Sequence, residues 1–176
     1  MIEDWYHKVS LPIHLVEDLN REIFPMLEKV KWLDCDPSQA PGSVWCLLTL
    51  PEQVRKRLEA AAQYKIYPDF YIWNYRDVKI LKIHKDTNAP GASRSVAGVI
   101  PLLGDFETQV YNDSDFHKPM ATCQYGPGDL LFLNNTKYHH GGRVLSPTRI
   151  SMHFYFDFYN THNESLATLL KKNKLD

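Results

Sequence analysis

The strongest constraint on the fold is the texture of the chain from about residue 71 onward. There the sequence consists of short apolar or alternating runs, separated by turn-forming residues such as Asn112-Asp113 and Gly126-Pro127-Gly128. The runs are YIWNY, VKILKIH, SVAGVIPLL, ETQVY, DLLFL and RISMHFYFDFY. Strands this short and this numerous, with no helical pattern between them, favour an antiparallel jelly roll over a parallel α/β sheet.

The preceding part of the chain is helical in pattern. Apolar residues recur at helical spacing in HLVEDLNREIFPMLEKV, where Pro25 should kink or shorten the helix, and Pro51 opens a second stretch, PEQVRKRLEAAAQY. We therefore expect one domain over residues 1–176, with helical support in 1–70, the β core in 71–160 and a closing helix and tail in 161–176. The predicted fold class is mainly β with flanking helices (α+β).

Charge and cysteine content exclude several function classes. Twenty Lys and Arg residues against 21 Asp and Glu give a net charge of −1, so the chain as a whole offers no electrostatic basis for binding nucleic acid or a membrane. The three cysteines form no CxxC pair, which argues against a disulfide framework or a thiolate zinc site. With no signal-peptide pattern and no run near the roughly 18 apolar residues of a membrane helix, we expect a soluble cytoplasmic protein.

A possible metal site begins at His84 and Asp86. Residues two apart on a strand point to one face, so this imidazole and carboxylate can address a common ion. An isolated pair of this kind is more often a surface feature beside a turn. Further along, however, a histidine pair precedes an arginine that opens the last apolar run. Two imidazoles and one carboxylate form the facial arrangement that holds non-haem Fe(II), and an arginine suits a distal carboxylate.

Because of these motifs, roughly the C-terminal hundred residues resemble the core of the Fe(II)- and 2-oxoglutarate-dependent dioxygenases. That core is a double-stranded β-helix, a cupin-like jelly roll. That family carries an HxD motif, a distal histidine and an arginine, often with a serine two residues beyond the arginine. The resemblance implies Fe(II) as cofactor, with 2-oxoglutarate and O2 as co-substrates. It implies that 2-oxoglutarate is bound by Arg149 and Ser151, and that the catalytic metal ligands are His84, Asp86 and His139. The run SRSVAGVIP is most similar to the aspartyl/asparaginyl hydroxylase branch, with the prolyl hydroxylases as the other related branch.

The choice between His139 and His140 depends on strand register, because adjacent strand residues face opposite sides. The family's commoner spacing of ten residues before Arg149 favours His139, whereas the HGG context favours His140 as the alternative ligand. Two further residues are expected to contact the co-substrate. Tyr111 could donate its hydroxyl, although a core aromatic is the competing interpretation, and Arg94 could reach a carboxylate or the substrate, although a surface ion pair is equally compatible.

The resemblance implies a hydroxylase that acts on a C–H bond of a peptide, an amino acid or a small metabolite and releases succinate and CO2. A cupin-like metalloenzyme that does not use 2-oxoglutarate is one alternative, which additional histidine ligands would favour. A non-catalytic binding module of the same fold is the other. The expected partner is a small-molecule or peptide substrate, and no motif in the sequence specifies it.

Overall fold

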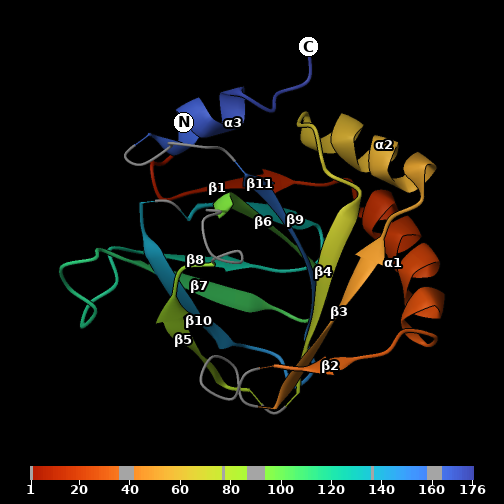
Figure 1. Cartoon of the computed structure of the whole chain (residues 1–176), viewed down its shortest axis with the longest axis horizontal. Coiled ribbons are helices and arrows are strands. Elements are labelled where there is room, and N and C mark those ends of the chain that lie inside the picture. The colour runs from red at the N-terminus through yellow and green to blue at the C-terminus, as the bar shows by residue number, and fades with distance from the viewer. Residues whose placement is uncertain (1, 36–41, 77, 87–93, 136, 158–163) are drawn as a thin grey trace.

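Two antiparallel sheets face each other in the computed structural model, which describes residues 2–35, 42–76, 78–86, 94–135, 137–157 and 164–176 (Figure 1). The larger sheet has the order β1-β9-β6-β11-β4-β3-β2 and the smaller one β5-β10-β7-β8. In the order of the larger sheet, the strands are Tyr6–Ser10, Asp129–Asn134, Arg94–Leu103, Ile150–Asp157, Asp69–Tyr75, Ser43–Thr49 and Leu33–Asp34. Those of the smaller sheet are Ile80–His84, His139–Val144, Phe106–Tyr111 and Ala121–Tyr125. This architecture confirms the predicted fold class.

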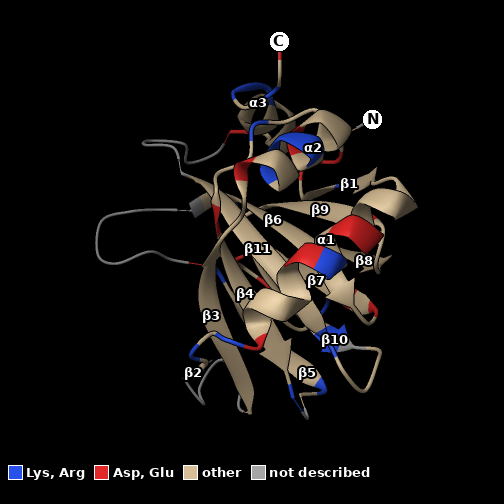
Figure 2. Ribbon diagram, turned by 90° about the vertical axis from the view of Figure 1, so that its right-hand side faces the viewer, with Lys and Arg blue, Asp and Glu red and all other residues tan. Residues whose placement is uncertain are grey.

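Helices cover the outer face of the larger sheet. The helix α1 (Ile13–Leu27) buries Leu15, Leu19 and Ile23, the apolar positions that recur at helical spacing. It continues through Pro25 and ends two residues later, and α2 (Glu52–Ala62) begins directly after Pro51. Figure 2 shows both helices in front of the strands, with charged residues along them. The short helix α3 (Leu166–Lys171) closes the chain. No helix in the described part of the chain is both long and apolar enough to span a membrane.

Alternation along β11 divides its side chains between two cores. Met152, Phe154 and Phe156 point to the helices and join the core beneath α1 and α2. Ser151 and His153 alternate with these residues and point into the space between the two sheets, where a second core is formed by residues of both sheets. The polar residues of β11 therefore face the interior of the β core, where the candidate site lies.

The described residues contain five strands that the sequence patterns did not predict. Three of them, β1, β2 and β3, lie within residues 1–70 and join the larger sheet, so this region contributes strands as well as helices. The others are β8 and β10. The segment of β10, HHGGRV, has no apolar alternation, and it is a strand because β5 and β7 pair with it on either side. All three cysteines are free and buried.

Candidate metal and co-substrate site

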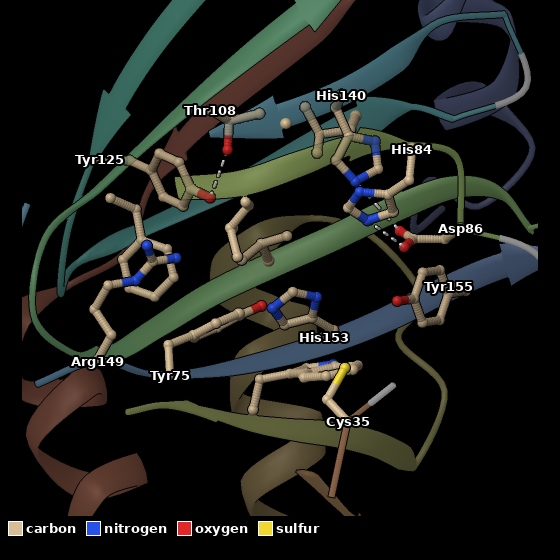
Figure 3. A pocket seen from close by; sticks show the side chains of 16 residues that line it. Cys35, Tyr75, His84, Asp86, Thr108, Tyr125, His140, Arg149, His153 and Tyr155 are labelled. Atoms are coloured by element: carbon tan, nitrogen blue, oxygen red, sulfur yellow. Dashed lines mark hydrogen bonds and ion pairs between the residues drawn. The ribbon is translucent and has the colours of Figure 1, made fainter. Parts of the chain in front are cut away.

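Two imidazoles and one carboxylate meet between the sheets (Figure 3). His84 ends β5, Asp86 follows two residues later, and His140 lies opposite His84 on the neighbouring strand β10. One ligand atom from each residue lies within 4.8 Å of the others. Nε2 of His84 is 3.3 Å from Oδ1 of Asp86, and Nε2 of His140 is 3.7 Å from Oδ2. This donor set is the two-histidine, one-carboxylate arrangement that suits non-haem Fe(II).

The structure corrects the preference for His139. Its Nδ1 atom lies 2.6 Å from Oδ1 of Asp113, and its ring packs edge-on against Phe116, on the side of β10 that faces away from the other two residues. The physical reason is register. His140 pairs with Val110, an inward-facing core residue, so the preceding residue must point outward. The chain stays in strand geometry through both following glycines, and the spacing from the inward histidine to the arginine is nine residues.

The electrostatics of Asp86 and His140 favour metal binding. Burial alone would raise the pKa of Asp86, but the charges and hydrogen bond of His140 and His84 outweigh it and hold this pKa well below its usual range. Burial lowers the pKa of His140 to about 4, against the opposing influence of Asp86. At neutral pH the pair therefore consists of a carboxylate and a neutral imidazole, the forms that ligate metals. Nδ1 of His140 is buried and has no hydrogen-bond partner in the described part of the chain.

Asn135 holds Asp86 in place. Its side-chain Oδ1 accepts a hydrogen bond of 2.9 Å from the backbone N–H of Asp86, and its Nδ2 donates one of 2.7 Å to the backbone carbonyl of the same residue. Asn135 is itself buried directly after β9, so these bonds join the Asp86 loop to the larger sheet. Sequence reasoning missed this residue, since only the polar Asn134-Asn135 pair after an apolar run marks it.

Arg149 lies at the other end of the same cavity. Only 1% of its surface is exposed, and its guanidinium carbon lies 3.3 Å from the ring centre of Phe106 and 4.5 Å from that of Tyr75. Nη1 donates to the carbonyl of Arg143 at 3.1 Å, while Nε is buried with no partner among the described residues. A buried cation without a counter-charge is costly, so this position favours an anionic ligand.

Hydroxyl groups surround this arginine. The hydroxyl of Ser151 lies 2.7 Å from Nε2 of His153 and hydrogen-bonds the phenol of Tyr75. On the smaller sheet, the hydroxyls of Thr108 and Tyr125 are 2.9 Å apart and face the same cavity. Tyr75, Thr108 and Tyr125 were not predicted from the sequence, although each lies two residues along its strand from a residue that packs in the core between the sheets.

The structure does not bring Tyr111 to the site. This residue shares the outward face of β7 with Glu107 and Gln109, and its hydroxyl donates to Gln109 at 2.7 Å. The expected co-substrate contact is therefore corrected, because only alternate residues of β7 face the cavity. Arg94 begins β6, but its side chain lies outside the described residues, so its role stays a prediction.

Comparison with known proteins supports the fold. No family model matches the chain, and no curated protein matches it. Among solved structures, a Pseudomonas putida prolyl-4-hydroxylase is 13% identical, with a TM-score of 0.62 over 88% of this chain and 92% of that chain. OsALKBH1 is 13% identical, with a TM-score of 0.65 over 89% and 100%. A Trichoplax adhaerens prolyl hydroxylase, solved with a peptide of hypoxia inducible factor, is 12% identical, with a TM-score of 0.63 over 88% and 84%.

These similarities identify the fold as the double-stranded β-helix of Fe(II)- and 2-oxoglutarate-dependent oxygenases. The resemblance found in the sequence is thereby confirmed at the level of fold. A fourth similar structure is described as a non-haem, α-ketoglutarate-dependent epimerase, so proteins of this fold are not confined to hydroxylation.

Proposed function

We propose that this chain is an Fe(II)- and 2-oxoglutarate-dependent oxygenase that hydroxylates a C–H bond of its substrate. The observation that carries the proposal is one cavity with two complementary ends. A two-histidine, one-carboxylate cluster lies at one end, and a buried arginine with an unpartnered Nε lies at the other. Neither end alone would define the reaction, but together they fit a ligand that chelates a metal and ends in a carboxylate.

His84, Asp86 and His140 would hold Fe(II). The fit rests on the donor set, one atom from each residue lying within 4.8 Å of the others. When bound, Fe(II) with 2-oxoglutarate and O2 would supply an oxidant for the substrate, so that C–H becomes C–OH and succinate and CO2 are released. The other oxygen atom of O2 enters succinate. Asn135 would fix the carboxylate ligand through its two backbone hydrogen bonds.

Arg149 would bind the distal carboxylate of 2-oxoglutarate. Its planar fork pairs with carboxylates, and Phe106 and Tyr75 exclude water around it, which strengthens such a pair. Ser151 lies on the same face of β11 and would add a hydroxyl donor, with its orientation set by His153 and Tyr75. The protein thus supplies orientation and a dry pocket, while the co-substrates supply the oxidising chemistry.

An anaerobic titration tests the proposal. Fe(II) is added to the full chain, followed by 2-oxoglutarate, and the visible metal-to-ligand charge-transfer band is recorded. We expect the band to appear in the wild type and to be lost with iron binding in His84→Ala, Asp86→Ala and His140→Ala. His139→Ala is the matched control and should keep it. Arg149→Ala should retain iron but require far more 2-oxoglutarate.

Each alternative predicts a different result. Bound iron without a band would contradict the use of 2-oxoglutarate and favour the cupin-like metalloenzyme. That alternative has lost its main support, because His139 faces away from the cluster and adds no ligand. A band without succinate formation under air would favour the non-catalytic binding module. A cytoplasmic location, expected from the sequence, stays a prediction.

A further inference from the structure

Aromatic side chains extend from the candidate site toward the edge of the larger sheet. Tyr71 and Trp73 alternate on β4 with residues of the helix-side core, so both face the side of the sheet that bears the site. Trp45 on β3 lies directly opposite Trp73, and Tyr155 on β11 borders the same cavity as Asp86 (Figure 3). We call these four residues the aromatic strip.

The rings of the aromatic strip form a continuous series of contacts. The ring centres of Tyr155 and Tyr71 are 5.8 Å apart, those of Tyr71 and Trp45 are 5.9 Å apart, and those of Trp45 and Trp73 are 6.2 Å apart. Trp73 in turn lies 6.3 Å from His153 inside the cavity. Contacts at these separations hold the rings in a fixed arrangement that leads from the cavity outward.

Half of the aromatic strip lies outside both cores, whereas Trp73 and Tyr155 pack against the core between the sheets. Trp45 and Tyr71 belong to neither of the two described cores, and both remain partly exposed. Leu33 and Leu47 extend the same face and are 41% and 55% exposed. A contiguous apolar surface that adjoins a concave cavity is typical of a ligand-binding site.

Charge and dimensions restrict what can lie on this surface. Among the described residues on this face of β2, β3 and β4, the one charged side chain is Asp69, which accepts a hydrogen bond of 2.7 Å from Thr49. A polyanion such as a nucleic acid would find no cation here for its phosphates. From β11 to β2 there are three strand spacings, about 14 Å. The described part of this surface is thus short, aromatic and without positive charge.

We propose that the substrate is a small, uncharged molecule with a fused aromatic ring system, which lies on the aromatic strip with a C–H bond directed toward the metal cluster. Flat rings stack on Trp and Tyr with little need for hydrogen-bond partners, which matches the side chains present. This inference deepens the proposed function and rests on it for the reaction. The binding surface itself can be tested without metal.

Isothermal titration calorimetry of the metal-free full chain is the test, with 2-naphthol as probe. Its matched controls are decahydro-2-naphthol, which is saturated and not planar, and naphthalene-2-sulfonate, which is planar but anionic. We expect 2-naphthol to bind at least fivefold more tightly than either control. Equal binding of the saturated compound would overturn the stacking argument, and preference for the sulfonate would overturn the argument from charge. Tighter binding of an acetylated, amidated Gly-Phe-Gly peptide would assign the surface to a peptide instead.

Two variants locate the probe. Trp45→Leu removes one ring from the strip and should weaken 2-naphthol about five- to tenfold, and Leu47→Asp places a charge at its exposed edge and should weaken it as well. Trp32→Leu is the matched control, since Trp32 packs against the helix-side core and not on the strip. Equal losses in Trp45→Leu and Trp32→Leu would contradict the proposal, as would unchanged affinity in both strip variants.

The 2-naphthol titration and the test of the proposed function can fail separately. The charge-transfer band with Fe(II) and 2-oxoglutarate should be unchanged in Trp45→Leu, because this residue contacts none of the candidate ligands. If 2-naphthol binds the strip but the band never forms, the oxygenase proposal fails and the binding surface stands. If the band forms and planar rings are not preferred, the inference about the substrate fails alone.

Discussion

Adjacent residues of one strand have different surroundings at this site, because alternate side chains point to opposite faces. His140 faces the cluster, whereas His139 contacts the carboxylate of Asp113, which also lies 3.0 Å from Nζ of Lys85. Asp113 thus contacts both Lys85 and His139, which are sequence neighbours of the candidate ligands. Its side chain is about half exposed, and surface ion pairs contribute about 0–1 kcal/mol. We therefore expect the buried contacts, more than this exposed one, to determine metal affinity.

Asn135→Ala should lower Fe(II) affinity by about tenfold, the range typical of groups that orient a metal ligand. The substitution leaves the N–H and carbonyl of Asp86 without these partners, so the ligand loop loses its fixed position. Anaerobic Fe(II) titration gives the affinity. Asn20→Ala is the control, because Asn20 also donates to a backbone carbonyl, that of Leu102, but away from the site. A similar loss of affinity in both variants would indicate a general structural effect.

Arg149→Met should abolish stabilisation by 2-oxoglutarate without destabilising the ligand-free protein. Methionine keeps much of the apolar contact with Phe106 and Tyr75, and it removes a buried charge whose Nε has no partner. The melting temperature, measured with and without 2-oxoglutarate in the presence of Fe(II) under argon, should rise with co-substrate only in the wild type. A rise of the same size in the variant would show that the anion binds elsewhere.

At the scale of elements, the strand β10 carries His140 and pairs with β5 on one side and β7 on the other. Two consecutive glycines follow His140 in this strand. A Cβ atom on Gly142 would lie 2.2 Å from the carbonyl oxygen of Glu107 on β7, so a side chain there cannot fit without moving one strand. At Gly141 the nearest atom, the carbonyl oxygen of Leu81, would lie at 3.1 Å. The glycines therefore allow close approach of the strands on both sides of His140.

Gly142→Ala should lower the free energy of unfolding by roughly 2–3 kcal/mol, the scale of overpacking in a tight site. Gly141→Ala, its neighbour, should cost less because the added methyl group meets looser contacts. Urea unfolding of the metal-free proteins gives both values. If the two variants are equally stable, the close contact with Glu107 does not limit the pairing of β10 with β7.

Much of this architecture could be predicted from sequence, for identifiable physical reasons. The segments 71–75, 78–84 and 95–103 alternate or are continuously apolar, so their strands were predicted, and HxD gave His84 and Asp86 because two residues share one strand face. The segment HHGGRV has no such pattern, and its register is set by strands distant in sequence. The spacing to Arg149 therefore favoured His139, whereas the structure groups His140 with His84 and Asp86. The contacts of Asn135 likewise depend on a loop separated from it by 49 residues in sequence.

At the scale of the whole molecule, the cavity makes stability depend on pH. Burial lowers the pKa of His153 to about 3, with Asp86 opposing this shift, whereas an unfolded histidine titrates near 6.5. Between these values the unfolded chain binds the proton and the folded protein does not, so this residue destabilises the fold as the pH falls. His140 acts in the same direction between about 6.5 and 4. His84 opposes both, because its pKa is raised despite burial, through its hydrogen bond and charge interaction with Asp86.

His153→Gln isolates one of these contributions. Glutamine can still hydrogen-bond the hydroxyl of Ser151 but does not titrate, so the variant should lose less stability than the wild type as the pH falls from 6.5 to 4.5. The difference between the two slopes should approach about 1.4 kcal/mol per pH unit, the value for one proton. Urea unfolding of the metal-free proteins at a series of pH values gives the slopes, and His14→Gln, on the partly exposed helix α1, is the control. Parallel curves for wild type and His153→Gln would mean that His153 takes up its proton at the same pH in the folded and the unfolded protein, which would contradict the effect of burial on its pKa.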